Sequence, residues 1–339
     1  MNEITYIFGA GASCQSMPLV SNFSIRFQIF EEYIEQSQPS SILLSHITQF
    51  KKEVEGHFSF DTFFKKLFHQ NNNDAIIERY KGILLIFFLF EHVIPPERLK
   101  SYSLFRKQMI DKTEKRQNID PRYEALIAGL LKPLKGKIDF YANINFFTWN
   151  YDVNLLYALK NFIAPGEKFI DFIGKGREDN YFKINEQVKV FHLNGVIYHP
   201  LLNHFNNDNS VEGFQNVVRR YEDDPEFKKY LHNIKFAWEQ ENLMNDTVIG
   251  NCILNSKNII LIGYSLPLYN RKVDSFILDS SKLRGKKLII QNLNSQGILE
   301  ILESDFNIAS NPKNISKENP TISGSDNCNS FIVPNSIFS

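Results

Sequence analysis

The first part of the chain, residues 4–13, places a short apolar run of β-forming residues directly before a loop of very small residues. The loop consists of Gly9, Ala10, Gly11, Ala12 and Ser13. Small residues let backbone N–H groups approach a phosphate, and the N-terminal end of a following helix favours the same anion. Glycine also permits a tight turn with no ligand at all. The sequence therefore predicts a strand that ends in a phosphate-binding loop or a structural turn.

Four later segments have the same strand-forming character. They are short and mostly apolar, are separated by helical or loop sequence, and span residues 144–149, 188–193, 258–262 and 287–291. Apolar runs of this length are typical of parallel strands that are covered on both faces. Together with the first segment, they predict an α/β fold with a Rossmann-like parallel sheet.

Between the first two strand segments, apolar residues recur at helical spacing instead. Helices are expected at about 23–36, 41–55, 59–70, 74–94 and 120–133. We therefore expect a large helical insertion at about residues 23–137, within one domain that covers residues 1–305. The remaining residues, 306–339, are rich in Ser, Asn, Pro and Lys and predict a polar tail that is flexible or docks a partner.

The bulk composition argues against several classes of function. The chain has 38 basic and 38 acidic side chains, so no net positive charge favours direct nucleic-acid binding. Cys14, Cys252 and Cys328 form no CxxC pair, which argues against a metal site and for a reducing compartment. The most apolar stretch, residues 82–90, is too short to span a membrane. We expect a cytoplasmic protein with no metal and no membrane association.

Small and polar residues lie at the end of each strand segment, where open α/β sheets bind ligands. Besides the loop at 9–13, they are Thr148, Asn150 and Asp152 at the second segment, His192, Asn194 and Gly195 at the third, Gly263 and Ser265 at the fourth, and Asn292 at the fifth. The carboxyl ends of parallel strands share one edge of a sheet. These residues are therefore the candidate site.

The order and content of these segments resemble the sirtuin-like superfamily of NAD-consuming proteins. The family's Gly-Ala-Gly-Ala-Ser loop is matched at residues 9–13, its Thr-x-Asn-x-Asp motif at 148–152, and its Gly-x-Ser motif at 263–265. The family's Leu-His-Gly motif has Asn194 in place of the catalytic histidine. His192 lies two residues earlier, on the same side of a strand, and we expect it to take the histidine's role. The alternative is that His192 is a buried structural residue and that Asn194 alone contacts ribose.

The resemblance also indicates a subclass. Protein-deacetylating sirtuins carry a four-cysteine zinc module, which three scattered cysteines cannot build. The chain is more similar to bacterial sirtuin-like domains that cleave NAD outright, often as effectors of antiphage defence by abortive infection. This resemblance implies NAD as the substrate, and activation through a homo-oligomer or a partner protein of the defence system.

The candidate residues suit cleavage of the nicotinamide–ribose bond, which passes through an oxocarbenium-like state. Backbone N–H groups of residues 9–13 would hold the pyrophosphate, and Ser265 and Asn292 would meet phosphate, ribose or adenine. Asn150 would hydrogen-bond ribose or water, and Asp152 would engage the nicotinamide amide or the developing cation. His192 would act as a general base or a ribose partner. The competing explanation is that Asn150 and Asp152 cap a helix that starts at about residue 153.

We therefore expect an NAD glycohydrolase that releases nicotinamide and ADP-ribose. The alternative is a non-catalytic module that senses NAD or an ADP-ribose derivative and signals to a partner; the missing histidine of the third motif favours it. A dinucleotide-dependent dehydrogenase is disfavoured. Cys14 replaces the third glycine of its G-x-G-x-x-G motif, and no acidic residue ends a strand about 20 positions later.

Overall fold

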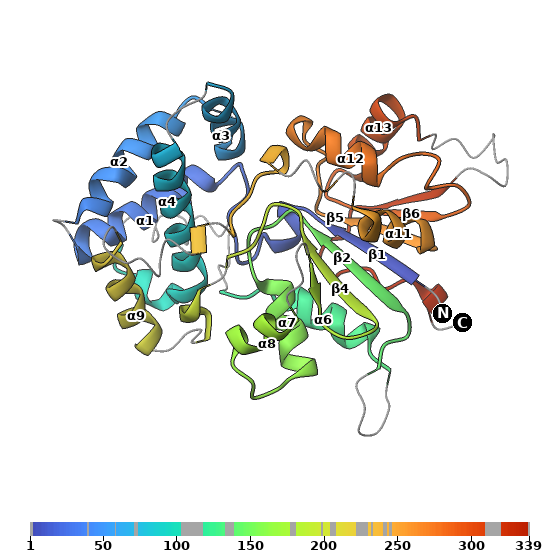
Figure 1. Cartoon of the computed structure of the whole chain (residues 1–339), viewed down its shortest axis with the longest axis horizontal. Helices are drawn as coiled ribbons and strands as arrows, with labels where there is room; N and C mark the ends of the chain where they lie inside the picture. The colour runs from blue at the N-terminus through green and yellow to red at the C-terminus, as the bar shows by residue number, and fades with distance from the viewer. Residues whose placement is uncertain are drawn as a thin grey trace.

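A sheet of seven strands lies at the centre of the described part of the chain in the computed structural model (Figure 1). The strands are β1 (Glu3–Phe8), β2 (Asn143–Thr148), β3 (Phe182–Lys183), β4 (Val188–His192), β5 (Asn258–Ile262), β6 (Lys287–Gln291) and β7 (Thr321–Ser325). The structure describes residues 3–38, 41–57, 59–70, 74–102, 118–132, 139–176, 181–197, 199–203, 208–221, 230–231, 233–239, 243, 246–308 and 320–337.

The strand order is β3-β4-β2-β1-β5-β6-β7, with β1 at the centre. Neighbouring strands run parallel, except that β3 pairs antiparallel with β4 at one edge. The five predicted strands correspond to β1, β2, β4, β5 and β6, so the predicted Rossmann-like α/β fold is confirmed. Sequence patterning missed the two edge strands, because β3 is very short and β7 is polar.

Helices cover the sheet on both faces. Successive side chains of a strand point to opposite sides, so each strand contributes side chains to two cores. In β1, Tyr6 and Phe8 enter one core, which also contains side chains of α6 (Pro121–Leu130) and α7 (Asn154–Ile163). Ile7 enters a second core. The helices of this second core are α11 (Thr247–Asn255), α12 (Arg271–Ile277) and α13 (Ser295–Phe306). Covering of both faces explains why the strands are almost continuously apolar.

A group of five helices lies beside the sheet, and we call it the helical module (Figure 1). Its members are α1 (Phe23–Ser37), α2 (Ile42–Val54), α3 (Phe60–His69), α4 (Asp74–Val93) and α9 (Asp208–Arg219). α4 is buried from Gly82 to Val93, and phenylalanine rings pack around it, with the ring centroids of Phe27 and Phe87 5.2 Å apart. The phenylalanines of the module belong to the same hydrophobic cluster as Tyr6 and Phe8 of β1, so the module and one face of the sheet share a continuous core.

The helical module differs from the predicted insertion in its membership. Its first four helices match the helices predicted at 23–36, 41–55, 59–70 and 74–94. The helix predicted at 120–133 corresponds to α6, which packs on α7 and the sheet, whereas α9 joins the module from the β4–β5 connection and packs on α4. Residues 103–117 and 133–137 of the predicted insertion lie outside the described residues.

Shorter helices connect these elements. They are η1 (Ala10–Ser13), η2 (Pro96–Leu99), α8 (Phe169–Lys175), η3 (Pro200–Asn203), η4 (Ala237–Glu239), η6 (Leu268–Asn270) and η8 (Asn335–Ile337). Among the helices that the structure describes, none has both the length and the apolar character needed to span a membrane.

The C-terminal segment, residues 320–337, is part of the fold, which corrects the prediction of a flexible or partner-docking tail there. β7 pairs with β6, and Phe331 is buried against Phe8 and Tyr123, with ring-centroid distances of 5.7 and 5.0 Å. The Tyr6 hydroxyl donates a hydrogen bond to the Ile332 carbonyl at 3.1 Å. A segment this polar can still be part of the fold, because β7 pairs with β6 through its backbone and a few apolar side chains anchor the rest. Residues 309–319 of the predicted tail lie outside the described residues.

This packing predicts that Phe331→Ala destabilises the protein. The free energy of unfolding should fall by about 3–5 kcal/mol, as for other buried phenylalanines replaced by alanine. Phe68→Ala is the matched control, because Phe68 is 45% exposed, and its effect should stay within about 0.5 kcal/mol. Denaturant titration measures both values. Equal, small effects of the two substitutions would mean that the C-terminal segment is not packed against the sheet.

Candidate active site

A pocket lies between the carboxyl ends of the strands and the helical module. The volume of the pocket, including the part that is open to solvent, is about 800 Å³. The loops that follow β1, β2, β4 and β5 supply much of the polar part of its wall, including Ala10, Ser13, Asn150, Asp152, Asn194 and Ser265. The apolar part comes from the helical module and the segment before it, and includes Met17, Leu19, Val20, Phe23, Phe60 and Phe88. The structure thus brings together predicted residues from four separate strand ends.

The glycines of the first loop are required by its contact with the loop after β5. The Gly11 N–H donates to the Gly263 carbonyl at 2.9 Å, and the Gly9 N–H donates to the Ile262 carbonyl at 3.0 Å. A Cβ atom on Gly263, whose φ is +59°, would lie 2.3 Å from the Ala12 nitrogen. The Ala12 N–H is also engaged, by the Gly9 carbonyl at 2.9 Å. Loop packing therefore accounts for the glycine pattern, and these three N–H groups already have partners within the protein.

Asn150 follows β2 and is held in one orientation. Its Nδ2 donates hydrogen bonds to the Gly9 carbonyl at 2.9 Å and to Ser13 Oγ at 3.0 Å. Its backbone N–H donates to Thr148 Oγ1 at 3.0 Å, so Thr148 shapes the turn and does not line the pocket. Because both hydrogens of Nδ2 are engaged, the acceptor Oδ1 is the part of the side chain that remains for a ligand.

Asp152 is buried in the same wall and also supports the start of α7. Its Oδ1 accepts hydrogen bonds from the backbone N–H of Asn154 at 3.0 Å and from the Asn154 side chain at 2.7 Å. Burial raises the pKa of the Asp152 carboxyl above its usual value, hydrogen bonds from Ser13 and Asn154 oppose this shift, and the charge of Asp120 adds to it. The capping explanation thus describes part of its role, and Asp152 also lines the pocket.

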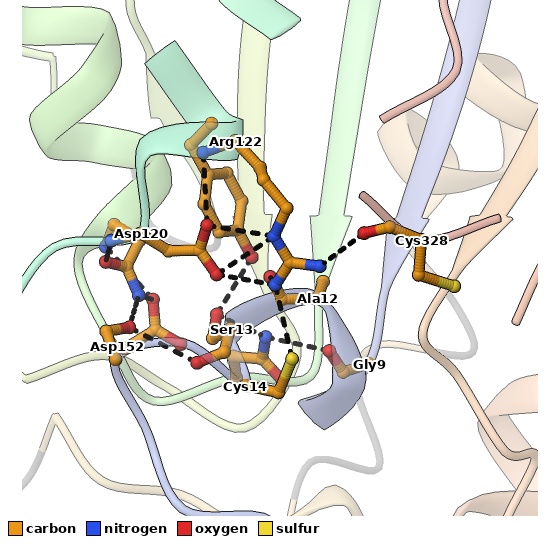
Figure 2. Close-up of polar contacts among 12 residues, drawn as sticks. Gly9, Ala12, Ser13, Cys14, Asp120, Arg122, Asp152 and Cys328 are labelled. Carbon is orange, nitrogen blue, oxygen red and sulfur yellow. Dashed lines mark hydrogen bonds and ion pairs between the residues drawn. The ribbon is translucent and has the colours of Figure 1, made fainter. Parts of the chain in front are cut away.

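A buried arginine supports the first loop from behind (Figure 2). Arg122 Nη2 donates to the Ala12 carbonyl, and its Nη1 donates to the Cys328 carbonyl, both at 2.9 Å. Its Nε donates to Asp120 Oδ1 at 2.9 Å, and the same carboxylate caps the start of α6. The guanidinium carbon also lies 4.9 Å from the centre of the Phe331 ring. One buried cation therefore ties the loop, α6 and the C-terminal segment together.

We predict that Arg122→Met lowers the free energy of unfolding by about 3–5 kcal/mol, because it leaves a buried carboxylate without its cation. The double variant Asp120→Asn/Arg122→Met should be less destabilised than the sum of the two single variants. Denaturant titration of all four proteins gives the coupling energy of the pair. Purely additive effects would show that Asp120 and Arg122 do not stabilise the fold as a pair.

His192 and Asn194 occupy different surroundings. His192 Nδ1 donates to the Asn150 carbonyl at 3.3 Å, its ring packs edge-on against Phe182, and it is not among the described residues that line the pocket. Burial lowers its pKa to about 4, against hydrogen bonds to backbone groups of Asn150 and Gly195. Asn194 does line the pocket, and its Nδ2 donates to the Trp149 carbonyl at 3.0 Å. This geometry matches the alternative of a structural His192.

The remaining predicted residues mostly shape the loops. Ser265 is exposed and lies in the pocket wall, whereas Gly195, Gly263 and Asn292 are not among the described residues that line it. Asn292 Nδ2 donates to the Tyr264 carbonyl at 3.2 Å, next to Ser265. Gly195 has a φ of +77°, and a Cβ atom there would lie 1.9 Å from a backbone oxygen. Asn292 and Gly195 therefore act on the pocket through the backbone of neighbouring segments.

Sequence analysis missed the aromatic part of the wall. Trp149 stacks on Tyr264 with ring centroids 5.8 Å apart and an angle of 18° between the planes. Tyr151 stacks on Phe88 at 5.4 Å and 18°. Trp149 and Tyr151 alternate with the polar residues of the second motif, so the sequence did carry a signal for them. Flat aromatic surfaces of this kind suit a planar ligand ring.

Asp61 is a further residue of the pocket wall that the sequence did not indicate. It lies in the first turn of α3, is 7% exposed, and lines the pocket. The Tyr151 hydroxyl donates to its Oδ1 at 3.3 Å. Burial raises the pKa of the Asp61 carboxyl to about 7, although the bond from Tyr151 and a backbone hydrogen bond oppose the shift. An aspartate in a first helical turn is ordinary, and only tertiary packing brings this one into the pocket.

The raised pKa makes stability depend on pH. Between about pH 4 and about pH 7 the folded protein keeps a proton on Asp61 that the unfolded chain has released, so stability falls as the pH rises through this window. Asp61→Asn removes the effect. Relative to the unsubstituted protein, its free energy of unfolding should therefore rise by up to about 3 kcal/mol between about pH 5 and about pH 8. Denaturant titrations at both pH values measure the change, and a pH-independent difference would contradict the prediction.

Comparison with protein-family models finds no match to this chain, and comparison with curated proteins finds none either. Within the described residues, no group of three or more His, Cys, Asp or Glu side chains is arranged to hold a metal ion. The groups that the pocket wall presents include an oriented amide, two buried carboxyls and stacked aromatic rings.

Proposed function

We propose that the protein is an NAD glycohydrolase, which cleaves NAD to nicotinamide and ADP-ribose. The observation that carries the proposal is the composition of the pocket wall, in which Asn150 and Asp152 after β2 and Asn194 after β4 adjoin stacked aromatic rings. Amide and carboxyl groups suit ribose hydroxyls, water and a cationic centre, and the rings suit a pyridine. The order of the motifs, which resembles that of sirtuin-like proteins, supports the same activity.

In the proposed reaction, the bond between ribose C1′ and the nicotinamide nitrogen breaks, and its electron pair leaves with nicotinamide. The oxygen of a water molecule bonds to C1′, and the proton that this water loses passes to solvent. Asn150 Oδ1 accepts a hydrogen bond from this water or from a ribose hydroxyl, since its Nδ2 is engaged by Gly9 and Ser13. Asp152 stabilises the positive charge that develops at C1′ in the oxocarbenium-like transition state.

His192 enters this proposal as a positioning residue, while Asn194 contacts ribose. The Nδ1–H of His192 bonds to the Asn150 carbonyl and so supports the turn that carries the Asn150 side chain. Because burial lowers its pKa to about 4, His192 is neutral near pH 7 and is a weak base for an attacking water. We therefore place its contribution in the orientation of Asn150.

We assign the phosphates of NAD to the outer part of the wall. Ala10 and Ser265 line the pocket and are exposed, so a backbone N–H and a hydroxyl are available there as donors. Gly9, Gly11 and Gly263 serve this site by letting the two loops meet without side chains between them. Asn292 holds the backbone next to Ser265 through the Tyr264 carbonyl.

The biological setting is proposed from the resemblance alone. Bacterial sirtuin-like domains that cleave NAD are often effectors of antiphage defence, and we propose the same role here. The protein would then act in the cytoplasm and stay inactive until it forms a homo-oligomer or binds an activating defence protein.

One observation favours a second candidate, a sensor that binds NAD or an ADP-ribose derivative without cleaving it. The wall has Asn194 at the motif's histidine position, and His192 is withdrawn from the pocket. A sensor would retain the ligand contacts of Asn150 and Asp152 but would lack a base for the attacking water. Recovery of intact NAD after long incubation with the protein would support it.

The hydrolase predicts that Asn150→Ala lowers the rate of nicotinamide release from NAD by at least about 100-fold, the usual cost of removing one oriented polar group from an active site. Asn161→Ala is the matched control, because Asn161 lies on α7 away from the pocket and bonds to Glu124. His192→Ala should have an intermediate effect. Chromatographic measurement of nicotinamide gives all the rates, and full activity of Asn150→Ala would reject the assigned mechanism.

A further inference from the structure

Asp61 brings a carboxyl group into the pocket from the helical module, whereas the other polar groups described above come from strand ends. Its carboxyl is next to Tyr151, the residue between Asn150 and Asp152 in the second motif. A carboxyl group buried to this degree needs partners, because burial without them is costly. A hydrogen-bonding partner in the pocket would offset the cost of burying the Asp61 carboxyl.

The surroundings of Asp61 leave acceptor capacity on its carboxyl. Its one side-chain hydrogen bond among the described residues is the long one from Tyr151, at 3.3 Å, whereas Asp152 accepts two shorter bonds from Asn154. A carboxylate has about four acceptor positions. Glu239 and Tyr269 act electrostatically on Tyr151, and the charge of Asp61 acts on Tyr269; Glu239 is itself paired with Lys81, whose Nζ lies 2.8 Å from Glu239 Oε2.

The rings around this carboxyl define the shape of what it meets. Tyr151 lies between Phe88, Phe60 and Phe236, with ring-centroid distances of 5.4, 6.0 and 6.2 Å. Such a wall accepts a planar ring, and the carboxyl at its edge accepts hydrogen bonds from a donor carried by that ring. A carboxamide on an aromatic ring has both properties.

We propose that Asp61 binds the carboxamide N–H group of the substrate's nicotinamide ring and makes the pocket select the amide over the corresponding carboxylic acid. This inference rests on the proposed hydrolase and adds the residue that reads its substrate. The acid analogue, nicotinic acid adenine dinucleotide, carries a carboxylate where NAD carries an amide. An ionised Asp61 repels that carboxylate. With the acid analogue, Asp61 also lacks the hydrogen bond that the amide of NAD would donate to it.

The test compares kcat/KM for NAD and for nicotinic acid adenine dinucleotide. At about pH 8, Asp61→Asn should raise the acid-to-amide ratio of kcat/KM at least tenfold, because asparagine is neutral and can also donate a hydrogen bond. Asp74→Asn is the matched control, since Asp74 lies in the first turn of the neighbouring α4 and is exposed. Its ratio should equal that of the unsubstituted protein. An unchanged ratio in Asp61→Asn overturns the inference.

The pH dependence separates substrate recognition from a structural role. In the unsubstituted protein, the acid-to-amide ratio should rise as the pH falls from about 8 to about 6, because Asp61 takes up a proton near pH 7. In Asp61→Asn this rise should be absent. A purely structural Asp61 would change the activity on both substrates together and leave the ratio flat with pH.

Binding measurements keep this inference distinct from the proposed activity. If the protein binds NAD but does not cleave it, either as the homo-oligomer or after addition of cell lysate as a source of an activator, the hydrolase is rejected, and calorimetric titration with free nicotinamide and free nicotinate tests Asp61 directly. A preference for nicotinamide that Asp61→Asn reduces at least tenfold supports the recognition role without catalysis. If cleavage occurs and the acid-to-amide ratio does not respond to Asp61→Asn, only the inference fails. If NAD, nicotinamide and nicotinate all fail to bind, both proposals are rejected.

Discussion

The close approach of two backbone loops is the constraint on which the pocket depends. Gly9 and Gly11, after the central strand, lie against Gly263, after the neighbouring strand, with no room for a side chain between them. Their hydrogen bonds hold the carboxyl ends of β1 and β5 together beyond the last strand residues. Asn150 then bonds to the same loop, so its amide is oriented by the contact rather than by its own strand. Small changes at these glycines would therefore displace several polar groups at once.

The pocket has two sides of different physical origin. Parallel strands deliver the polar side, and their rigid hydrogen-bonded ends hold each amide and carboxyl in place. The helical module delivers the apolar side and Asp61. Within the module, Arg26 of α1 forms a buried ion pair with Glu91 of α4, and Arg26 also donates a hydrogen bond to the Ser16 carbonyl, which joins the module to the segment after the first loop. Electrostatic interactions are stronger in surroundings of low dielectric constant, such as those that the apolar side provides for the polar groups. The shape of the pocket thus depends on the packing of the module as much as on the sheet.

The sequence was sufficient for the fold and for part of the site, for identifiable reasons. Strands β1, β2, β4, β5 and β6 are long enough and apolar enough to show the pattern of buried parallel strands, and four helices of the module show helical periodicity. The polar residues at strand ends were found because topology places such ends together. Asp61 and Phe88 could not be found, since only packing of the module against the sheet brings them there. The expectation that His192 and Asn194 face the same side is not met, because alternation along a strand ceases to hold where β4 ends and the chain turns at Gly195; the alternative, a buried structural His192, fits this geometry.

The contact between the first strand and the C-terminal segment has a consequence for synthesis. Phe8 packs against Phe331, and the loop after β1 is supported through Arg122 by the Cys328 carbonyl. A ribosome makes these partners at opposite ends of the chain, and contacts between such distant residues form late in folding. A nascent chain shorter than about 330 residues therefore lacks the support for its own ligand loop. Interrupted synthesis therefore yields products without a finished pocket, and for the NAD hydrolase that we propose, such products would be inactive.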